Sequence, residues 1–144
     1  MHTRRFFNLE EEQRIIDAIR HAESQSSAEV RVHINKHSEG DVVSYAQEIF
    51  TFLGMDKTEL HNGVLIYLAV ENRNFAVIGD HAIHERVGQI YWDTLRNEMQ
   101  AEFKNESVCS GIVHAIEKLA NTLKKYFPVL PKDKNEIIDD ISYG

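Results

Sequence analysis

The chain has 144 residues, of which 42% are hydrophobic and 27% charged, and these proportions are ordinary for one soluble globular domain with a sizeable core. Its formal net charge of −7 leaves no basic footprint, which argues against non-specific nucleic-acid binding and against an anionic membrane surface.

Cellular context is indicated by the single cysteine and by the N-terminal sequence. Cys109 has no second cysteine with which to form an intrachain disulfide, which fits a reducing compartment. Arg4 and Arg5 near the N-terminus are not followed by the apolar segment of a signal peptide. No run approaches the roughly 20 apolar residues of a membrane span. We therefore expect a cytoplasmic protein without a membrane span.

The first third of the chain predicts a helix, a strand and a helix. Asn8 and Glu11 have the spacing of a capping box, and apolar residues recur at helical intervals over residues 9–24. Residues 28–34 alternate apolar and polar side chains, which predicts a strand with one buried face and one partly solvated face. Asp41 suits the N-cap of a second amphipathic helix that we expect to stop at Gly54.

The stretch around which the chain is organised is residues 64–70, seven apolar residues without a charge. It is short and rich in β-branched and aromatic residues, which predicts a strand buried on both faces. The polar residues 71–74 and the short apolar run 75–79 then predict an antiparallel hairpin.

Helical patterns fill most of the remaining sequence. One helix is expected to begin near Ala82, a further helical stretch covers 92–104, and the last covers 108–126 with Ser107 as its cap. Pro128 and Pro131 close that helix. The acidic tail, residues 132–144, keeps three isoleucines that we expect to dock it on the body. They are Ile137, Ile138 and Ile141.

This order of elements predicts an α/β fold in one domain, residues 1–144, with a core over about 9–127 and a docked tail over 128–144. A strand, helix, strand unit usually makes a right-handed crossover between parallel strands. Helices on both faces of a small mixed sheet follow from it.

The same topology predicts that polar residues meet at one end of the sheet. Parallel first and second strands start at the same end, and the hairpin returns the end of the third strand there. The residues expected together are Ser27, Glu29, His61, Asn62, Asp80 and His81, with His84 and Glu85 one helical turn further on. Carboxylates suit Ca²⁺ or Mg²⁺, and added histidines favour Zn²⁺ or another transition metal. The alternative is an N-cap aspartate beside solvated loop histidines.

Known catalytic motifs are absent from the sequence. His81 and His84 lack the H-E-x-x-H spacing of zinc proteases, and there is no P-loop, G-x-S-x-G or G-x-G-x-x-G. Cys109 opens a helix, but no arginine follows in the loop that a cysteine phosphatase would use, which favours a packed cysteine. The acidic tail residues lack the glycine and alternation of an EF-hand, so we expect solvated charge, with calcium contact as the alternative.

Several short motifs resemble the TPM domain, a family named partly for a thylakoid lumen protein and widespread in bacteria. The matching residues are Ala28-Glu29-Val30, Asn62-Gly63-Val64-Leu65, Asn72-Arg73, Val77-Ile78-Gly79, Phe103 and Gly111-Ile112. A short, stand-alone, soluble bacterial branch is indicated by Gly79-Asp80, Ile83-His84-Glu85, Trp92-Asp93, Tyr126-Phe127-Pro128 and Asn135-Glu136.

The resemblance implies a three-layer α/β/α sandwich and offers several activities. Plant relatives are described as acid phosphatases in photosystem repair, an animal relative modulates a receptor, and some members bind calcium. Where family members often have Asp before Asn62, this chain has His61, and Asp80 replaces a residue that is often aromatic. The acid has moved to the neighbouring strand end, which either preserves a metal site with altered ligands or abolishes it.

The leading hypothesis is a divalent-cation-binding interaction module, with Ca²⁺ favoured and a protein partner at the same end. The expected metal ligands are Glu29, Asp80, His84 and Glu85, and the expected binding residues are His61, Asn62, Arg73 and His81. The first alternative is a metal-assisted phosphomonoesterase, in which a cation activates water and Asp80 or His84 transfers protons. The second is a structural domain without a site. The sequence indicates no particular substrate or oligomeric state.

Overall fold

The computed structural model describes residues 6–130 and 141–144, which form a mixed sheet between helices. The strands are β1 (Glu29–Asn35), β2 (Gly63–Ala69), β3 (Asn74–Gly79) and β4 (Ile141–Tyr143), in the spatial order β3-β2-β1-β4. β1 is parallel to both β2 and β4, whereas β2 and β3 form an antiparallel hairpin. Every residue of β2 is buried, which confirms the prediction for the central strand.

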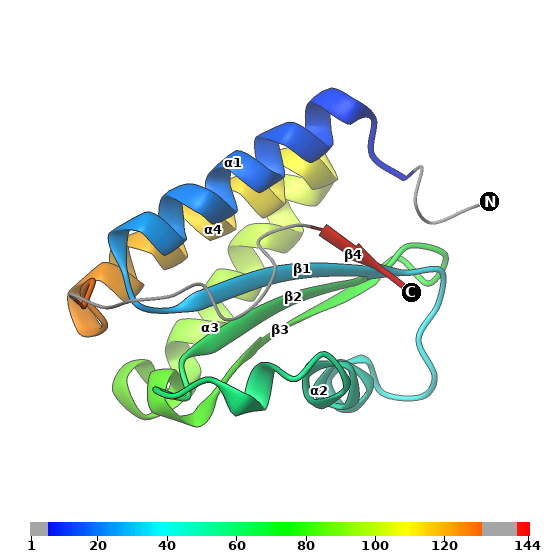
Figure 1. Cartoon of the computed structure of the whole chain (residues 1–144). Coiled ribbons are helices and arrows are strands. Elements are labelled where there is room, and N and C mark those ends of the chain that lie inside the picture. The colour runs from blue at the N-terminus through cyan, green and yellow to red at the C-terminus, as the bar shows by residue number, and fades with distance from the viewer. Residues whose placement is uncertain (1–5, 131–140) are drawn as a thin grey trace.

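The helices cover both faces of the sheet, which confirms the predicted α/β/α sandwich (Figure 1). They are α1 (Leu9–Gln25), α2 (Val42–Phe52), the short 3₁₀ helix η2 (Met55–Lys57), α3 (His81–Asn105) and α4 (Val108–Tyr126). In Figure 1, α1 and α4 lie above the sheet and α2 lies below it.

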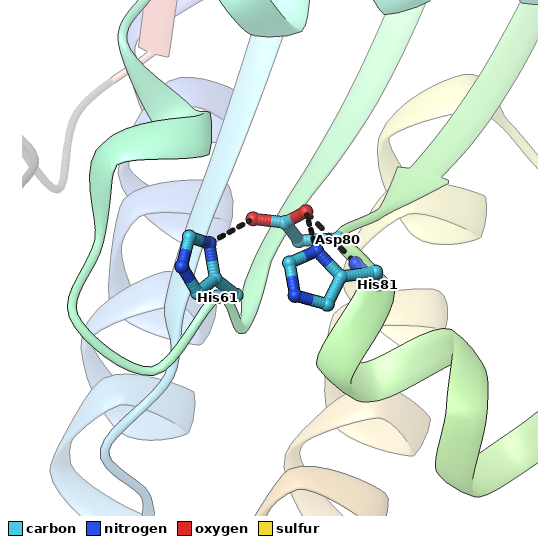
Figure 2. A group of neighbouring side chains, drawn as sticks. All are labelled: His61, Asp80 and His81. Atoms are coloured by element: carbon cyan, nitrogen blue, oxygen red, sulfur yellow. Dashed lines mark hydrogen bonds and ion pairs between the residues drawn. The ribbon is translucent and has the colours of Figure 1, made fainter.

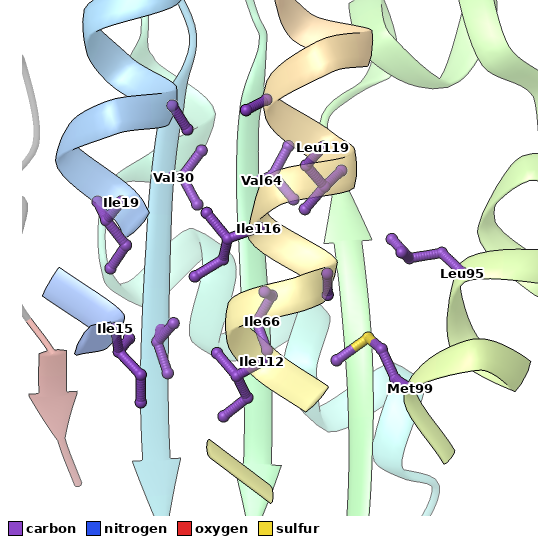
Figure 3. Close-up of a cluster of buried hydrophobic side chains, with 14 of the residues drawn as sticks. Ile15, Ile19, Val30, Val64, Ile66, Leu95, Met99, Ile112, Ile116 and Leu119 are labelled. Atoms are coloured by element: carbon purple, nitrogen blue, oxygen red, sulfur yellow. The ribbon is translucent and has the colours of Figure 1, made fainter. Parts of the chain in front are cut away.

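Two apolar cores follow from the alternation of side chains in the strands. The larger core joins the even-numbered residues of β1 and β2 to α1, α3 and α4, as Figure 3 shows for Val30, Val64 and Ile66 packed against Ile116. The smaller core joins the opposite face of β2, including Leu65 and Tyr67, to α2 and η2. Cys109 is buried in the larger core, which confirms that it is a packed residue.

The helix starts could be predicted from the sequence because each carries a side-chain cap. Asn8 and Glu11 form the reciprocal capping box predicted for α1. Asp41 caps α2 and Ser107 caps α4, each by accepting a hydrogen bond from a backbone N–H of the first turn. α3 joins the two helical stretches expected near Ala82 and over 92–104 through a kink at Gly88, whose φ of 77° breaks the helical path.

One face of β1 differs from the prediction of a partly solvated strand. Glu29 and His33, which lie on the polar side of the alternation, are only 3% and 4% exposed, and Asn35 is buried as well. β4 pairs along the β1 edge beside these residues. The side chains of His33 and Asn35 are hydrogen-bonded inside the protein, to Ser142, to each other and to Tyr67.

The tail contributes β4, a strand that the sequence did not predict. Ile141 is buried in the larger core, as expected for a docking residue. Ser142 and Tyr143 pair in parallel with His33 and Ile34 of β1. Ile137 and Ile138, together with the acidic residues considered for calcium contact, lie outside the described residues. The acidic residues are Asp133, Glu136, Asp139 and Asp140.

Candidate metal centre

Strand register brings three loop ends to the same end of the sheet. Glu29 at the start of β1 pairs with Gly63 at the start of β2, and Gly79 at the end of β3 pairs with Val64. The parallel crossover on which the predicted convergence depends is therefore confirmed.

Three side chains meet at this end, as Figure 2 shows: His61, Asp80 and His81. His61 precedes β2 in a left-handed backbone conformation with φ 51°, and Asp80 sits between the end of β3 and the first turn of α3. Backbone hydrogen bonds fix both segments. The Asp80 N–H donates to the Gly63 carbonyl at 2.9 Å, and the Ala82 N–H donates to the His61 carbonyl at 3.2 Å.

Asp80 is the centre of this cluster. Its Oδ1 accepts a hydrogen bond from the His81 backbone N–H at 2.8 Å, and Oδ1 also lies 3.3 Å from His81 Nδ1. Its Oδ2 lies 3.6 Å from His61 Nδ1, within ion-pair range but beyond hydrogen-bond length. Oδ2 is buried and has no hydrogen-bond partner, which is costly for a carboxylate oxygen unless something else binds it.

The two histidines form the open side of the cluster. Their rings lie 4.5 Å apart between centroids, and their side chains are 46% and 62% exposed, against 12% for Asp80. One possible ligand atom from each of the three residues lies within 4.8 Å of the other two. Two imidazoles and one carboxylate form a common protein ligand set for a divalent metal, with further positions left to solvent.

The other residues predicted for this site lie around the cluster or away from it. Glu29 is buried at the start of β1, and Glu85 is exposed on α3. His84 Nδ1 accepts a hydrogen bond from Trp92 Nε1 at 3.0 Å, which occupies that nitrogen. Asn62 is buried, and its Nδ2 lies 3.5 Å from Ser27 Oγ. Their participation in ligand binding stays a prediction.

Arg73 lies in the β2–β3 turn, at the opposite end of these strands from Asp80. Its φ of 52° places it in the left-handed region, and its side chain is exposed. Because of this position, Arg73 does not belong to the cluster of His61, Asp80 and His81. A binding role for Arg73 would therefore involve a separate surface.

Sequence reasoning missed a second polar cluster, on the α2 side of β1. His33 lies 2.9 Å from Asn35 Oδ1 through Nε2 and 2.7 Å from Ser142 Oγ through Nδ1. Asn35 Nδ2 donates to the Tyr67 hydroxyl at 2.9 Å, and Arg31 Nε donates to Ser142 Oγ at 3.0 Å. Burial lowers the pKa of His33 and raises that of Tyr67 to about 12. The alternation in β1 was the available signal, but the covering strand β4 was not predicted.

Comparison with known proteins identifies the class of fold and then the family. A profile of the TPM domain matches residues 2–122, so the chain belongs to the TPM domain family. The NMR structure of the BA42 protein from the psychrophilic bacterium Bizionia argentinensis is similar, with a TM-score of 0.89 and 47% identity over 96% of each chain. No match was found among curated proteins.

A more distant structure has the same fold. The N-terminal domain of the cg2496 protein from Corynebacterium glutamicum gives a TM-score of 0.65 at 15% identity, over 82% of this chain and 74% of that one. Within residues 6–130 and 141–144, no helix is long and apolar enough to cross a membrane. The cytoplasmic location stays a prediction.

Proposed function

We propose that this TPM domain binds a divalent cation through His61, Asp80 and His81 and acts as a cation-dependent interaction module. The observation that carries the proposal is the buried Asp80 Oδ2, which has no hydrogen-bond partner and lies beside two imidazoles. A cation would satisfy this oxygen and offset the cost of burying it. The half-exposed histidines would leave coordination positions that water or an acidic group of a partner could fill.

The donor set favours a transition metal over calcium. Ca²⁺ prefers about six to eight oxygen ligands, whereas two imidazoles with one carboxylate suit Zn²⁺ and related ions. The family resemblance favours Ca²⁺, which would require oxygen ligands besides Asp80, with Glu29 and Glu85 as the acidic residues predicted nearby. We therefore propose Zn²⁺ as the preferred ion and Ca²⁺ as the competing choice.

The cluster supports binding better than phosphate-ester hydrolysis. Besides a metal ion, a phosphatase commonly uses lysine or arginine side chains to hold and neutralise the transferred phosphoryl group. The three clustered residues include no lysine or arginine, and Arg73 lies at the far end of the strands. The proposed function is therefore cation-dependent recognition.

The test is a thermal-shift titration of chelator-treated protein with Zn²⁺, Ca²⁺, Mg²⁺ and Mn²⁺. Saturable binding stabilises the folded state by about 2.7 kcal/mol when the ion is at about 100 times its Kd. We expect this response for Zn²⁺, and we expect Asp80→Asn to abolish it. Asparagine caps a helix as well as aspartate does, so the fold should survive the substitution.

A matched control is available in Asp41, the N-cap aspartate of α2. Asp41→Asn makes the same chemical change away from the cluster and should leave the titration unchanged. His61→Asn, which tolerates the positive φ, tests the imidazole contribution separately. A flat response to all four ions, or an Asp80→Asn response equal to that of the parent, contradicts the proposal.

A further inference from the structure

β3 is an edge strand whose outer side carries none of the usual protections against pairing. It is the terminal strand of the sheet order β3-β2-β1-β4 in the described part of the chain. Its six residues include no charge and no proline, and its ladder with β2 runs through six consecutive pairs without a bulge. Proteins usually block such an edge with lysine, proline or a bulge, because an unblocked edge pairs with another strand.

The alternation of hydrogen-bonded and non-hydrogen-bonded pairs between β2 and β3 identifies which β3 backbone groups face outward. The Asp80 N–H donates to Gly63, so Asp80 and Gly63 form a hydrogen-bonded pair. In an antiparallel ladder such pairs alternate with pairs whose N–H and C=O groups point away from each other. Ile78 and Ala76 therefore bond to β2, while the backbone groups of Phe75, Val77 and Gly79 point to the outer edge. The Phe75 N–H already donates to Asn74 Oδ1 at 3.1 Å, which leaves Val77 and Gly79 for pairing.

This edge forms the floor of a groove of about 450 Å³ between two helices. Val43 and Gln47 of α2 form one wall, and Trp92 and Arg96 of α3 form the other. The walls stand on both sides of the strand, so a single extended segment fits this recess better than the edge of a second folded copy. Such an added strand would continue the sheet and bury side chains against both walls.

The charge in the groove indicates the chemistry of the occupant. Among the described residues, Arg96 has no carboxylate within ion-pair distance, and its guanidinium lies 5.3 Å from the centre of the Phe75 ring. Asp93 accepts a hydrogen bond from Gln89 at 3.0 Å. Arg96 is exposed at the groove wall, so a carboxylate of the occupant could reach it and form a charge-assisted hydrogen bond.

We propose that this groove binds an extended, acidic segment of another protein, which pairs with β3 through Val77 and Gly79 and with Arg96 through a carboxylate. The proposal rests on one part of the proposed function, namely interaction with a partner, and it specifies the chemistry of that partner. It does not need the cation, although His81 belongs to both the groove lining and the cation cluster. A bound segment would therefore lie beside the ion.

The experiment uses a phage-displayed library of random decapeptides, selected on the full chain in the presence of chelator. Enriched sequences are synthesised and measured by calorimetry and by amide hydrogen exchange. We expect enriched peptides to contain Asp or Glu and to slow the exchange of the Val77 and Gly79 amides. Arg96→Glu should weaken their binding by about tenfold or more. Lys124→Glu, an equal charge change on the exposed side of α4, should not weaken it.

Two further variants test strand pairing itself. Val77→Pro removes an outward N–H while leaving the hydrogen bonds of Ala76 and Ile78 to β2, and it should abolish binding. Gln47→Trp fills the groove from the α2 wall without altering the strand, so the test still works if the proline variant does not fold. Circular dichroism and thermal unfolding verify the fold of each variant.

Several outcomes would overturn the proposal. They are the absence of enriched peptides, amide protection away from β3, and equal affinity for the parent, Arg96→Glu and Gln47→Trp proteins. Concentration-dependent protection of the same amides without peptide would assign the edge to a second copy of this chain instead. Cation stabilisation without peptide binding would overturn this inference alone. Peptide binding in chelator without any cation response would remove only the cation half of the proposed function.

Discussion

At the scale of single residues, Asp80 shows how one carboxylate can serve both fold and site. Oδ1 accepts the backbone hydrogen bond that starts α3, while Oδ2 is buried without a hydrogen-bond partner. An N-cap role alone requires only the first oxygen. The sequence predicts Asp80 as a possible helix N-cap. Its proximity to His61 depends on the parallel register of β1 and β2.

The hydrogen-bond partners of His33 determine the protonation state of its imidazole ring. Asn35 Nδ2 donates to Tyr67, so Asn35 Oδ1 is left to accept a hydrogen bond from His33 Nε2. His33 Nδ1 lies 2.7 Å from Ser142 Oγ and is placed to accept from this hydroxyl, whose other acceptor, the Val32 carbonyl, is further away at 3.4 Å. This arrangement suits a neutral imidazole with its proton on Nε2, in agreement with the lowered pKa that burial and the nearby Arg31 cause.

The state of His33 predicts an acid-sensitive contribution to stability. Its folded pKa lies below the ordinary value of 6.5, so the unfolded chain takes up this proton at a higher pH than the folded protein does. The contribution is complete above about pH 6.5 and is lost as pH falls from there through the folded pKa. We expect His33→Gln to reduce the slope of unfolding free energy against pH in this window, measured by urea unfolding.

The control is His37→Gln, which alters an exposed histidine in the loop after β1. It should leave the slope as it is in the parent protein. An identical slope in the parent and in His33→Gln would show that His33 protonates equally in the folded and unfolded states.

At the scale of elements, β3 and α3 are held together by close contact at a glycine. An ideal Cβ built on Gly79 would lie 2.3 Å from Cζ2 of Trp92, far inside normal contact distance. The Trp92 indole is in turn held by its hydrogen bond to His84 at 3.0 Å. Gly79 is therefore required by packing, since its φ is not in the left-handed region.

Gly79→Ala should destabilise the fold by about 1–3 kcal/mol, the usual cost of overpacking. Chemical unfolding measures this cost in the parent and in a Trp92→Phe background. The smaller phenyl ring removes the contact, so the cost should fall in that background. Equal costs in the two backgrounds would place the strain somewhere other than the contact between Gly79 and Trp92.

The elements themselves were predictable where local signals and burial agreed. The bounds of α4 could be read from its Ser107 cap, its apolar stripe and the following proline. The kink that joins the two parts of α3 could not be anticipated, because a glycine inside a helical pattern does not specify its φ. The burial of Glu29 and His33 was also missed, since alternation distinguishes the two faces of a strand but not what covers each face.

At the scale of the whole molecule, β4 of the tail pairs along one edge of the sheet, while β3 forms the other edge without a further strand among residues 6–130 and 141–144. β4 was not predictable, because three residues are too few for a strand pattern and their partner β1 is more than 100 positions earlier. β4 links layers as well as strands. Ile141 enters the larger core, Ser142 bonds to Arg31 and His33, and the Tyr143 hydroxyl donates to Glu12 of α1.

Removal of residues 141–144 therefore tests how much of the fold depends on this closure. Loss of the buried Ile141 side chain alone should lower the free energy of unfolding by about 1.5–3 kcal/mol. Exposure of the β1 edge should also speed hydrogen exchange of the β1 amides that face β4, because that edge then opens to water.

A full-length Ser142→Ala variant separates the hydrogen bonds from strand pairing. It keeps the β4 backbone and Ile141 but deprives Arg31 and His33 of their hydroxyl partner, so it should lose stability without faster exchange along β1. If truncation changes neither unfolding nor exchange, β4 contributes nothing to the closure of the sheet. The acid sensitivity assigned to His33 would then have to come from the α2-side face alone, because β4 would not contribute to the burial of the imidazole.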